Sequence, residues 1–146
     1  MLRLRRPGSD DDGIWQLIVQ ELIPRSNNEW DAKEIKDELP QRLKRGITYV
    51  YTDGLDRIYG FIHAVFNNRK LIIDMLAVTT PMHGKGIGLR LLSATEQTAL
   101  QKDCLSSLLL IDKGNDQAKR FYERNGYVIT RYIPSLKCYE MEKQLK

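Results

Sequence analysis

Cysteine and histidine are both scarce in this sequence. The 146 residues include only two cysteines, Cys104 and Cys138, and two histidines, His63 and His83, which lie far apart. No Cys-x-x-Cys pair is present, and no cysteine or carboxylate stands at metal-ligand spacing from either histidine. The sequence therefore predicts neither a disulfide framework nor a metal site, and its cysteine usage favours a cytoplasmic protein.

Long apolar runs are also missing. The N-terminus begins Met1-Leu2-Arg3-Leu4-Arg5-Arg6 and passes directly into Pro7-Gly8, whereas a signal peptide needs an apolar stretch at this place. The apolar run Leu108–Ile111 is too short to cross a bilayer. We therefore expect a soluble intracellular protein that has no membrane partner.

Neither sign of charge dominates the chain. Lys and Arg number 23 against 19 Asp and Glu, and the formal net charge of +4 is scattered over the sequence. A mild excess of this kind suits an anionic ligand at least as well as a nucleic acid, and the lack of a dense basic tract argues against nucleic acid as a partner. The length and the ordinary composition fit one domain over residues 1–146.

The hydrophobic pattern changes its period several times along the chain. Apolar residues at helical spacing follow Asp10–Asp12 and stop at Pro24, and a second amphipathic segment from Trp30 to Leu43 contains Pro40, which we expect to break or kink the helix. Alternating or continuous apolar runs predict strands. The expected strands are Leu2–Arg5, Ile47–Thr52, Arg57–Phe66, Lys70–Thr80, Leu105–Asp112, Tyr127–Ile133 and Lys137–Lys143, and further helices are expected over Ile87–Lys102 and from Asn115 to Asn125.

This order of elements predicts an α/β fold with three layers. Its centre is a mixed sheet of about seven strands with helices on both faces. The segment from Lys70 through the following helix to Leu105 has the form of a βαβ unit, so its two strands should be parallel. No internal repeat, low-complexity tract or domain linker interrupts the chain.

A glycine-rich turn joins the central strand of this unit to its helix. Gly84, Gly86 and Gly88 allow a ligand to approach the backbone closely, and the start of the helix directs free N–H groups at it, so phosphate is the natural occupant. A Walker A loop is excluded because Gly84-Lys85 is followed by glycine and Thr79 stands where its first glycine belongs. The dinucleotide pattern Gly-x-Gly-x-x-Gly fails as well. The alternative is a flexible turn that only starts a helix.

Two segments together resemble the signatures of the GNAT superfamily of N-acetyltransferases. The turn is similar to the family's acyl-CoA motif Gln/Arg-x-x-Gly-x-Gly/Ala, with His83 in the first place and Gly86 and Gly88 in the two small places. Downstream, the segment from Asn115 to Tyr127 is similar to Asn-x-x-Ala-x-x-Phe-Tyr-x-x-x-Gly-Phe/Tyr. It matches at Asn115, Ala118, Phe121, Tyr122, Gly126 and Tyr127.

The resemblance implies a GNAT-like sheet that binds acetyl-CoA as a co-substrate between two splayed parallel strands. The pantetheine arm would pair with strand backbone as an added strand, and the pyrophosphate would sit on the N–H groups of the turn. Asn115 would bond the pantetheine region, or would only cap the helix. The residues implied in cofactor binding are Leu76, Ala77, Val78, His83, Gly84, Lys85, Gly86, Ile87, Gly88, Leu89, Asn115 and Ala118.

For chemistry the resemblance points to Tyr122. An amine that attacks the thioester directly displaces a CoA thiolate, and a phenol near the sulfur can give that thiolate a proton. The alternative is that Phe121 and Tyr122 are two core aromatics. The base is less defined: Ile72 stands where histone-type members carry a glutamate, and Asp74 on the same strand face is either a base or a structural hydrogen-bonding group.

These expectations lead to an acetyl-CoA-dependent N-acetyltransferase that acts on the primary amine of a small molecule. Glu29, Trp30 and Asp31 in the acceptor region would suit a cationic substrate. A protein or peptide acceptor, a non-catalytic acyl-CoA-binding module and a nucleic-acid-binding protein are the alternatives. The identity of the acceptor and the oligomeric state, with a homodimer as one option, stay open.

Overall fold

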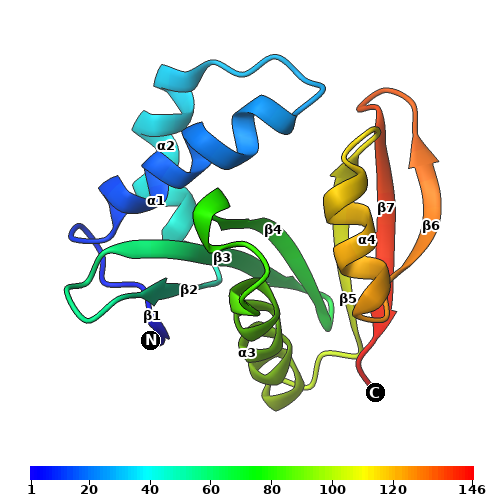
Figure 1. The fold of residues 1–146 in the computed structure, drawn as a ribbon. Coiled ribbons are helices and arrows are strands. Elements are labelled where there is room, and N and C mark those ends of the chain that lie inside the picture. Colours follow the sequence, from blue (N-terminus) through cyan, green and yellow to red (C-terminus); the bar gives the residue numbers. More distant parts are fainter.

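Seven strands form one mixed sheet in the computed structural model, which describes all residues 1–146 (Figure 1). Their order is β1-β2-β3-β4-β5-β7-β6, and every neighbouring pair is antiparallel except β4 and β5, which are parallel. The strands are β1 (Leu2–Leu4), β2 (Ile47–Thr52), β3 (Ile58–Asn67), β4 (Lys70–Val78), β5 (Ser106–Asp112), β6 (Val128–Ile133) and β7 (Cys138–Gln144). The predicted α/β fold with about seven strands is confirmed.

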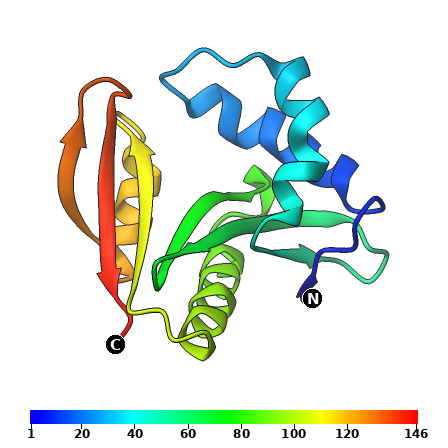
Figure 2. The ribbon, with the colours of Figure 1, turned by 180° about the vertical axis from the view of Figure 1, so that it is seen from behind.

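Helices cover both faces of the sheet, as predicted. One face carries α1 (Asp11–Leu17), its continuations η1 (Ile18–Leu22, a π-helix) and η2 (Ile23–Arg25, a 3₁₀ turn), and α2 (Ala32–Lys44); the other carries α3 (Ile87–Gln101) and α4 (Asp116–Arg124). Figures 1 and 2 show α1 and α2 on the side of the sheet opposite α3. No helix is both long enough and apolar enough to cross a bilayer.

One detail of the two N-terminal helices departs from the sequence expectation. The α2 helix does not end at Pro40 but runs through it to Lys44, because Leu39 and Leu43 on either side of the proline are buried against the sheet. At the start of α1, Asp10 caps no backbone N–H with its side chain. Its carboxylate instead accepts two hydrogen bonds from Arg3, at 2.7 and 2.9 Å, which ties the helix to β1.

A bulge in β4 changes which residues face which helices. His63 of β3 pairs with Met75, but Ala64 pairs with Ile73, so Asp74 is an extra residue without a partner. Ile73 consequently belongs to the core beneath α3 and α4, whereas Met75 belongs to the core beneath α1 and α2. A regular strand would have placed these two residues on the same face.

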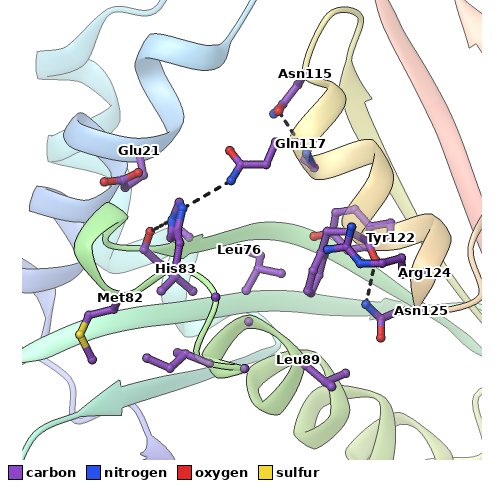
Figure 3. Close-up of a pocket in the computed structure, with 18 of the residues that line it drawn as sticks. Glu21, Leu76, Met82, His83, Leu89, Asn115, Gln117, Tyr122, Arg124 and Asn125 are labelled. Carbon is purple, nitrogen blue, oxygen red and sulfur yellow. Dashed lines mark hydrogen bonds between the residues drawn. The ribbon is translucent and has the colours of Figure 1, made fainter.

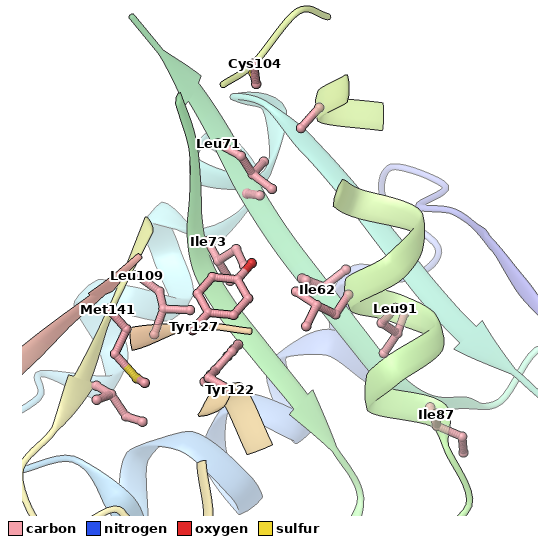
Figure 4. Packing of buried hydrophobic residues seen from close by; sticks show 14 residues of the cluster. Ile62, Leu71, Ile73, Ile87, Leu91, Cys104, Leu109, Tyr122, Tyr127 and Met141 are labelled. Atoms are coloured by element: carbon pink, nitrogen blue, oxygen red, sulfur yellow. The ribbon is translucent and has the colours of Figure 1, made fainter. Parts of the chain in front are cut away.

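The two parallel strands separate soon after they begin to pair. Only Lys70–Ile73 of β4 is in register with Ser106–Leu109 of β5, and beyond this stretch the two strands diverge (Figure 1). The larger core, on the α3 and α4 side, closes the base of this opening. Figure 4 shows Tyr122 and Tyr127 among its members, between β4, β5 and α3.

Candidate active site

A cavity of about 550 Å³ lies where β4 and β5 have separated (Figure 3). Four parts of the chain line it: the η1 and η2 turns, the end of β4, the glycine-rich loop with the first turn of α3, and one face of α4. Its wall includes Glu21, Leu22, Arg25, Leu76, Ala77, Val78, Met82, His83, Gly84, Gly86, Ile87, Gly88, Leu89, Asn115, Gln117, Ala118, Phe121, Tyr122, Arg124 and Asn125.

The glycine-rich loop presents a row of free backbone donors to this cavity. The N–H groups of residues 84–89 donate to no group of the chain, and the first backbone bond of α3 comes from Arg90 to the carbonyl of Gly86. Gly84 and Gly86 both adopt φ of +79°, which other residues rarely tolerate, and a Cβ at either position would meet nothing within 4 Å. The loop is thus an open concave surface whose amides, at the positive end of a 15-residue helix, suit a phosphate.

The end of β4 offers a second set of backbone groups. Thr79 donates its N–H to the carbonyl of Tyr59, which continues the β3–β4 pairing, and hydrogen-bonded pairs alternate along an antiparallel ladder. Ala77 therefore points its backbone groups at β3, while Leu76 and Val78 point theirs the other way, toward the opening. The sheet has an unpaired edge there that can accept an extended ligand.

Tyr122 reaches the cavity from α4. Its ring is held edge-on between Phe121, at 5.1 Å, and Tyr127, at 5.4 Å between ring centroids. Burial, with a smaller contribution from the charge of Glu96, raises the pKa of Tyr122 well above its ordinary value, and no hydrogen bond contributes to the shift. Tyr122 is a wall residue of the cavity, and its hydroxyl makes no hydrogen bond within the chain.

His83 and Asn115 both line the cavity and both have a local structural role. His83 donates from Nε2 to the carbonyl of Val78 at 2.6 Å, and its Nδ1 lies 3.4 Å from the side-chain nitrogen of Gln117 (Figure 3). Asn115 caps α4, since its Oδ1 accepts the N–H of Ala118 at 3.3 Å. The capping alternative for Asn115 is thus observed, and its place in the wall leaves the amide nitrogen available to a ligand.

Two of the predicted site residues have side chains that do not line the cavity. Lys85 is exposed and contributes only its backbone N–H to the loop. Asp74 lies at the bulge on the α2 side, where Arg42 donates to both of its carboxylate oxygens at 2.8 and 2.6 Å. Of the two roles considered for Asp74, this geometry supports the structural one.

Glu21 and Arg25 are wall residues. Glu21 was not predicted, and Arg25 was implied only as the start of the loop from Arg25 to Trp30 at the acceptor pocket. Glu21 follows Ile14, Leu17 and Ile18 at helical spacing, so it is a carboxylate on the apolar stripe of its helix. A carboxylate at such a position is expected to be buried and to have a partner. Glu29, Trp30 and Asp31, by contrast, do not line the cavity, and Asp31 caps α2 by accepting the N–H of Glu34.

A central parallel pair that splays apart, a cradle of free amides at a helix start and a buried phenol beside it define an acyl-CoA-dependent acyltransferase. The model of the GNAT acetyltransferase family matches residues 14–127, and the chain belongs to that family. No curated protein sequence matches the chain.

Solved structures share the whole fold with this chain. A structure of Ard1 from Thermoplasma volcanium is 25% identical, with a TM-score of 0.80, and the match covers 99% of this chain and 96% of that one. The PaiA N-acetyltransferase from Thermoplasma acidophilum, in complex with coenzyme A, has a TM-score of 0.84 at 18% identity and 99% coverage of both chains. An aminoglycoside 6'-acetyltransferase type Ii has a TM-score of 0.82 at 19% identity, covering 100% of this chain and 97% of its own.

Proposed function

We propose that residues 1–146 act as one acetyl-CoA-dependent N-acetyltransferase domain that transfers an acetyl group to the primary amine of a small molecule. One observation carries this proposal: a single cavity contains the free amides of residues 84–89, the unpaired edge of β4 and the protonated phenol of Tyr122. The free amides suit a pyrophosphate, the strand edge suits a pantetheine arm, and the phenol suits the sulfur of a thioester.

The residues present fit acetyl-CoA. The amides of Gly84 to Leu89 would hold the pyrophosphate. The backbone of Leu76 and the N–H of Val78 would pair with the pantetheine arm, since the carbonyl of Val78 already accepts a hydrogen bond from His83. Ala77, His83, Asn115 and Ala118 would shape the walls of this channel, and Lys85 would contribute its backbone. In support, the PaiA structure of the same fold is described as a complex with coenzyme A.

Acetyl-CoA supplies the acyl group as a thioester. In the proposed reaction the amine nitrogen forms a bond to the carbonyl carbon, the carbon–sulfur bond breaks, and Tyr122 donates its proton to the departing sulfur. A phenol carries its proton at neutral pH, so Tyr122 can donate a proton in this reaction but cannot remove one from the amine. Tyr122 then regains a proton from solvent.

The cavity wall offers no free carboxylate to deprotonate the amine. Glu21 uses both carboxylate oxygens in hydrogen bonds to Thr80 and Arg25, and Asp74 is held by Arg42 outside the cavity. We propose that the amine loses its proton to water. The rate should then rise with pH until the acceptor amine is deprotonated.

Two measurements test the proposed function. Acetyl-CoA at about one hundred times its Kd should stabilise the fold by roughly 2.7 kcal/mol, seen as a rise in Tm, whereas ATP and NADH should have much smaller effects. Release of CoA thiol in a screen of small amines and peptides should identify acceptors. An equal Tm shift with ATP, or no thiol release with any amine, would contradict the proposal.

A further inference from the structure

One wall of the cavity is not used by the acetyl-CoA site proposed above. The glycine-rich loop, the edge of β4 and α4 account for the pyrophosphate, the pantetheine arm and the thioester. The remaining wall comes from η1 and η2, which contribute Glu21, Leu22 and Arg25. The acceptor must reach the thioester from the side that CoA leaves open. The charge and hydrogen-bonding groups of these residues should therefore determine which acceptor binds.

Glu21 is the fixed point of this wall. Its side chain is only 8% exposed, and it accepts hydrogen bonds from the N–H of Thr80 at 3.1 Å and from the hydroxyl of Thr80 at 2.9 and 3.0 Å. Thr80 starts the turn that leads into the glycine-rich loop. Glu21 is placed for this contact by the wide π-helical turn Ile18–Leu22, a form that often occurs at functional sites.

Arg25 is held by Glu21 and still has donors to spare. Its Nη1 donates to the carboxylate of Glu21 at 3.1 Å and to the backbone carbonyl of the same residue. Its Nε and Nη2 groups make no hydrogen bond within the chain, and the side chain is 37% exposed. A guanidinium fixed through one nitrogen presents the rest of its planar fork in a set direction, which is the geometry that binds a carboxylate in bidentate fashion.

The chain beyond Arg25 is anchored as well. The side-chain nitrogen of Asn27 donates to the carbonyl of Lys113 at 2.6 Å, and that of Asn28 donates to the carbonyl of Leu136 at 3.3 Å. These bonds tie the loop between α1 and α2 to the loop that precedes α4 and to the β6–β7 turn. Arg25 thus lies between two anchored points, Glu21 on one side and Asn27 on the other, so its backbone is held in place in the cavity wall.

We propose that Arg25 binds a carboxylate of the acceptor, so that the substrate is a small amine that also carries a carboxylate, such as an amino acid. This inference rests on the proposed function and narrows it. It also reverses the expectation of a cationic acceptor, since Glu29 and Asp31 do not line the cavity and the charge of Glu21 is already paired. Glu21 acts as the positioning residue that orients the guanidinium.

The test compares amines that differ only in the carboxylate. Thiol release is measured with L-amino acids, with their carboxamides, and with peptides whose first residue is acidic, on wild type and on Arg25→Gln, Arg25→Lys and Glu21→Gln. The exposed Arg45→Gln is the matched control. Comparing each variant with wild type on the same amine cancels differences in amine basicity.

We expect wild type to prefer amino acids over carboxamides. Arg25→Gln should lower kcat/KM for the amino acid by about tenfold or more while leaving the carboxamide and the KM of acetyl-CoA nearly unchanged. Arg25→Lys and Glu21→Gln should lose part of the preference for amino acids over carboxamides. Arg45→Gln should keep the whole preference. If Glu21 had a purely structural role, Glu21→Gln would lower kcat/KM equally for the amino acid and for its carboxamide.

Several results would overturn the inference. Transfer to amines regardless of a carboxylate would do so while leaving the proposed function intact. A preference for acidic peptides over free amino acids would also overturn the inference, and would make a peptide rather than a small molecule the acceptor. A raised acetyl-CoA KM in Arg25→Gln would assign the guanidinium to the co-substrate. Failure of every amine to release thiol would remove the proposed function itself.

Discussion

The two faces of the sheet differ in whether their polar groups have hydrogen-bond partners. On the α1 and α2 face, the carboxylate of Asp74 is held by Arg42 at two points. There Nδ1 of the fully buried His63 lies 2.8 Å from the hydroxyl of Thr48, although its Nε2 has no hydrogen-bond partner. On the α3 and α4 side, the hydroxyl of Tyr122 and the amides of residues 84–89 have no partner in the chain, and all of them surround one cavity.

This difference distinguishes polar groups that stabilise the fold from polar groups that are available to a ligand. A buried polar group without a hydrogen bond costs folding free energy, so most such groups are paired, as Asp74 is. Groups left unpaired around an accessible cavity keep their hydrogen-bonding capacity for water or for a ligand. The pairing of Asp74 indicates a role in stability, whereas the unpaired groups around the cavity are available to a ligand.

The largest effect is expected from Tyr122→Phe, which removes one hydroxyl from the cavity side. If Tyr122 protonates the leaving thiolate, kcat should fall by about 10² to 10⁴-fold while the Kd of acetyl-CoA changes little. The free energy of unfolding should stay within about 0.5 kcal/mol, because the hydroxyl has no partner to lose. Kinetics near the pH optimum and a denaturation curve measure both quantities.

Near-wild-type kcat in Tyr122→Phe, at a pH where chemistry limits the rate, would make Tyr122 a core aromatic. The cavity side would then lose its proton donor, and the contrast between the two faces would hold for binding only.

The next effect is expected from Gly86→Val, which changes the amide cradle. A valine at φ +79° is strained and its side chain would project into open space, so the loop should shift and the Kd of acetyl-CoA should rise by about tenfold or more. The matched control is Gly8→Val, since Gly8 has φ +83° and equally open surroundings but lies away from the cavity.

Both glycine variants should lose similar stability, and only Gly86→Val should lose affinity. Titration calorimetry with acetyl-CoA measures this. Equal affinities in the two folded variants would remove the cradle from the binding site.

On the opposite face, Asp74→Asn should act on stability. The change weakens the paired hydrogen bonds to Arg42, whose side chain is 38% exposed and can be rehydrated, so a loss of roughly 1 to 2 kcal/mol is expected. The value of kcat should stay within about twofold. A hundredfold loss of kcat with unchanged stability would instead make Asp74 the general base, and the two faces would no longer divide as described.

The smallest effect is a pH dependence of stability from His63. Burial lowers the pKa of His63 below 6.5 in the folded protein, against a smaller opposing effect of Asp74. As the pH falls through 6.5 the unfolded chain takes up a proton that the folded chain refuses, so stability falls. One proton limits the slope to about 1.4 kcal/mol per pH unit.

Urea denaturation between pH 7.5 and pH 5.5 measures this slope, and His63→Gln should flatten it. A slope that is the same in both proteins would assign the acid sensitivity in this pH range to groups other than His63.

Much of the cavity could be predicted because it is made of backbone. Glycines at alternating positions before a helix favour a close approach of phosphate to the backbone, so the spacing of Gly84, Gly86 and Gly88 predicted an anion site, with a flexible turn as the alternative. Tyr122 was identified from a motif of six matching positions. Each of these lies on one continuous segment, so its neighbours along the chain carry the signal.

Asp74 and Arg25 show where this reasoning stops. The role of Asp74 depends on Arg42, which is 32 residues away in sequence, and on a bulge that no local pattern indicates. Arg25 was named only as the start of the loop from Arg25 to Trp30 that the resemblance implies for the acceptor, and its own role could be proposed only once the fold placed it on the cavity wall beside Glu21.

The sequence by itself determined the order of the elements, the parallel βαβ unit and the cradle of amides, because hydrophobic period, glycine and chain connectivity are local properties. Only the tertiary structure decided which polar side chains are paired and which are free. That decision depends on desolvation and on contacts between residues distant in the chain, such as Thr80 with Glu21, and these exist only once the sheet and its helices have packed.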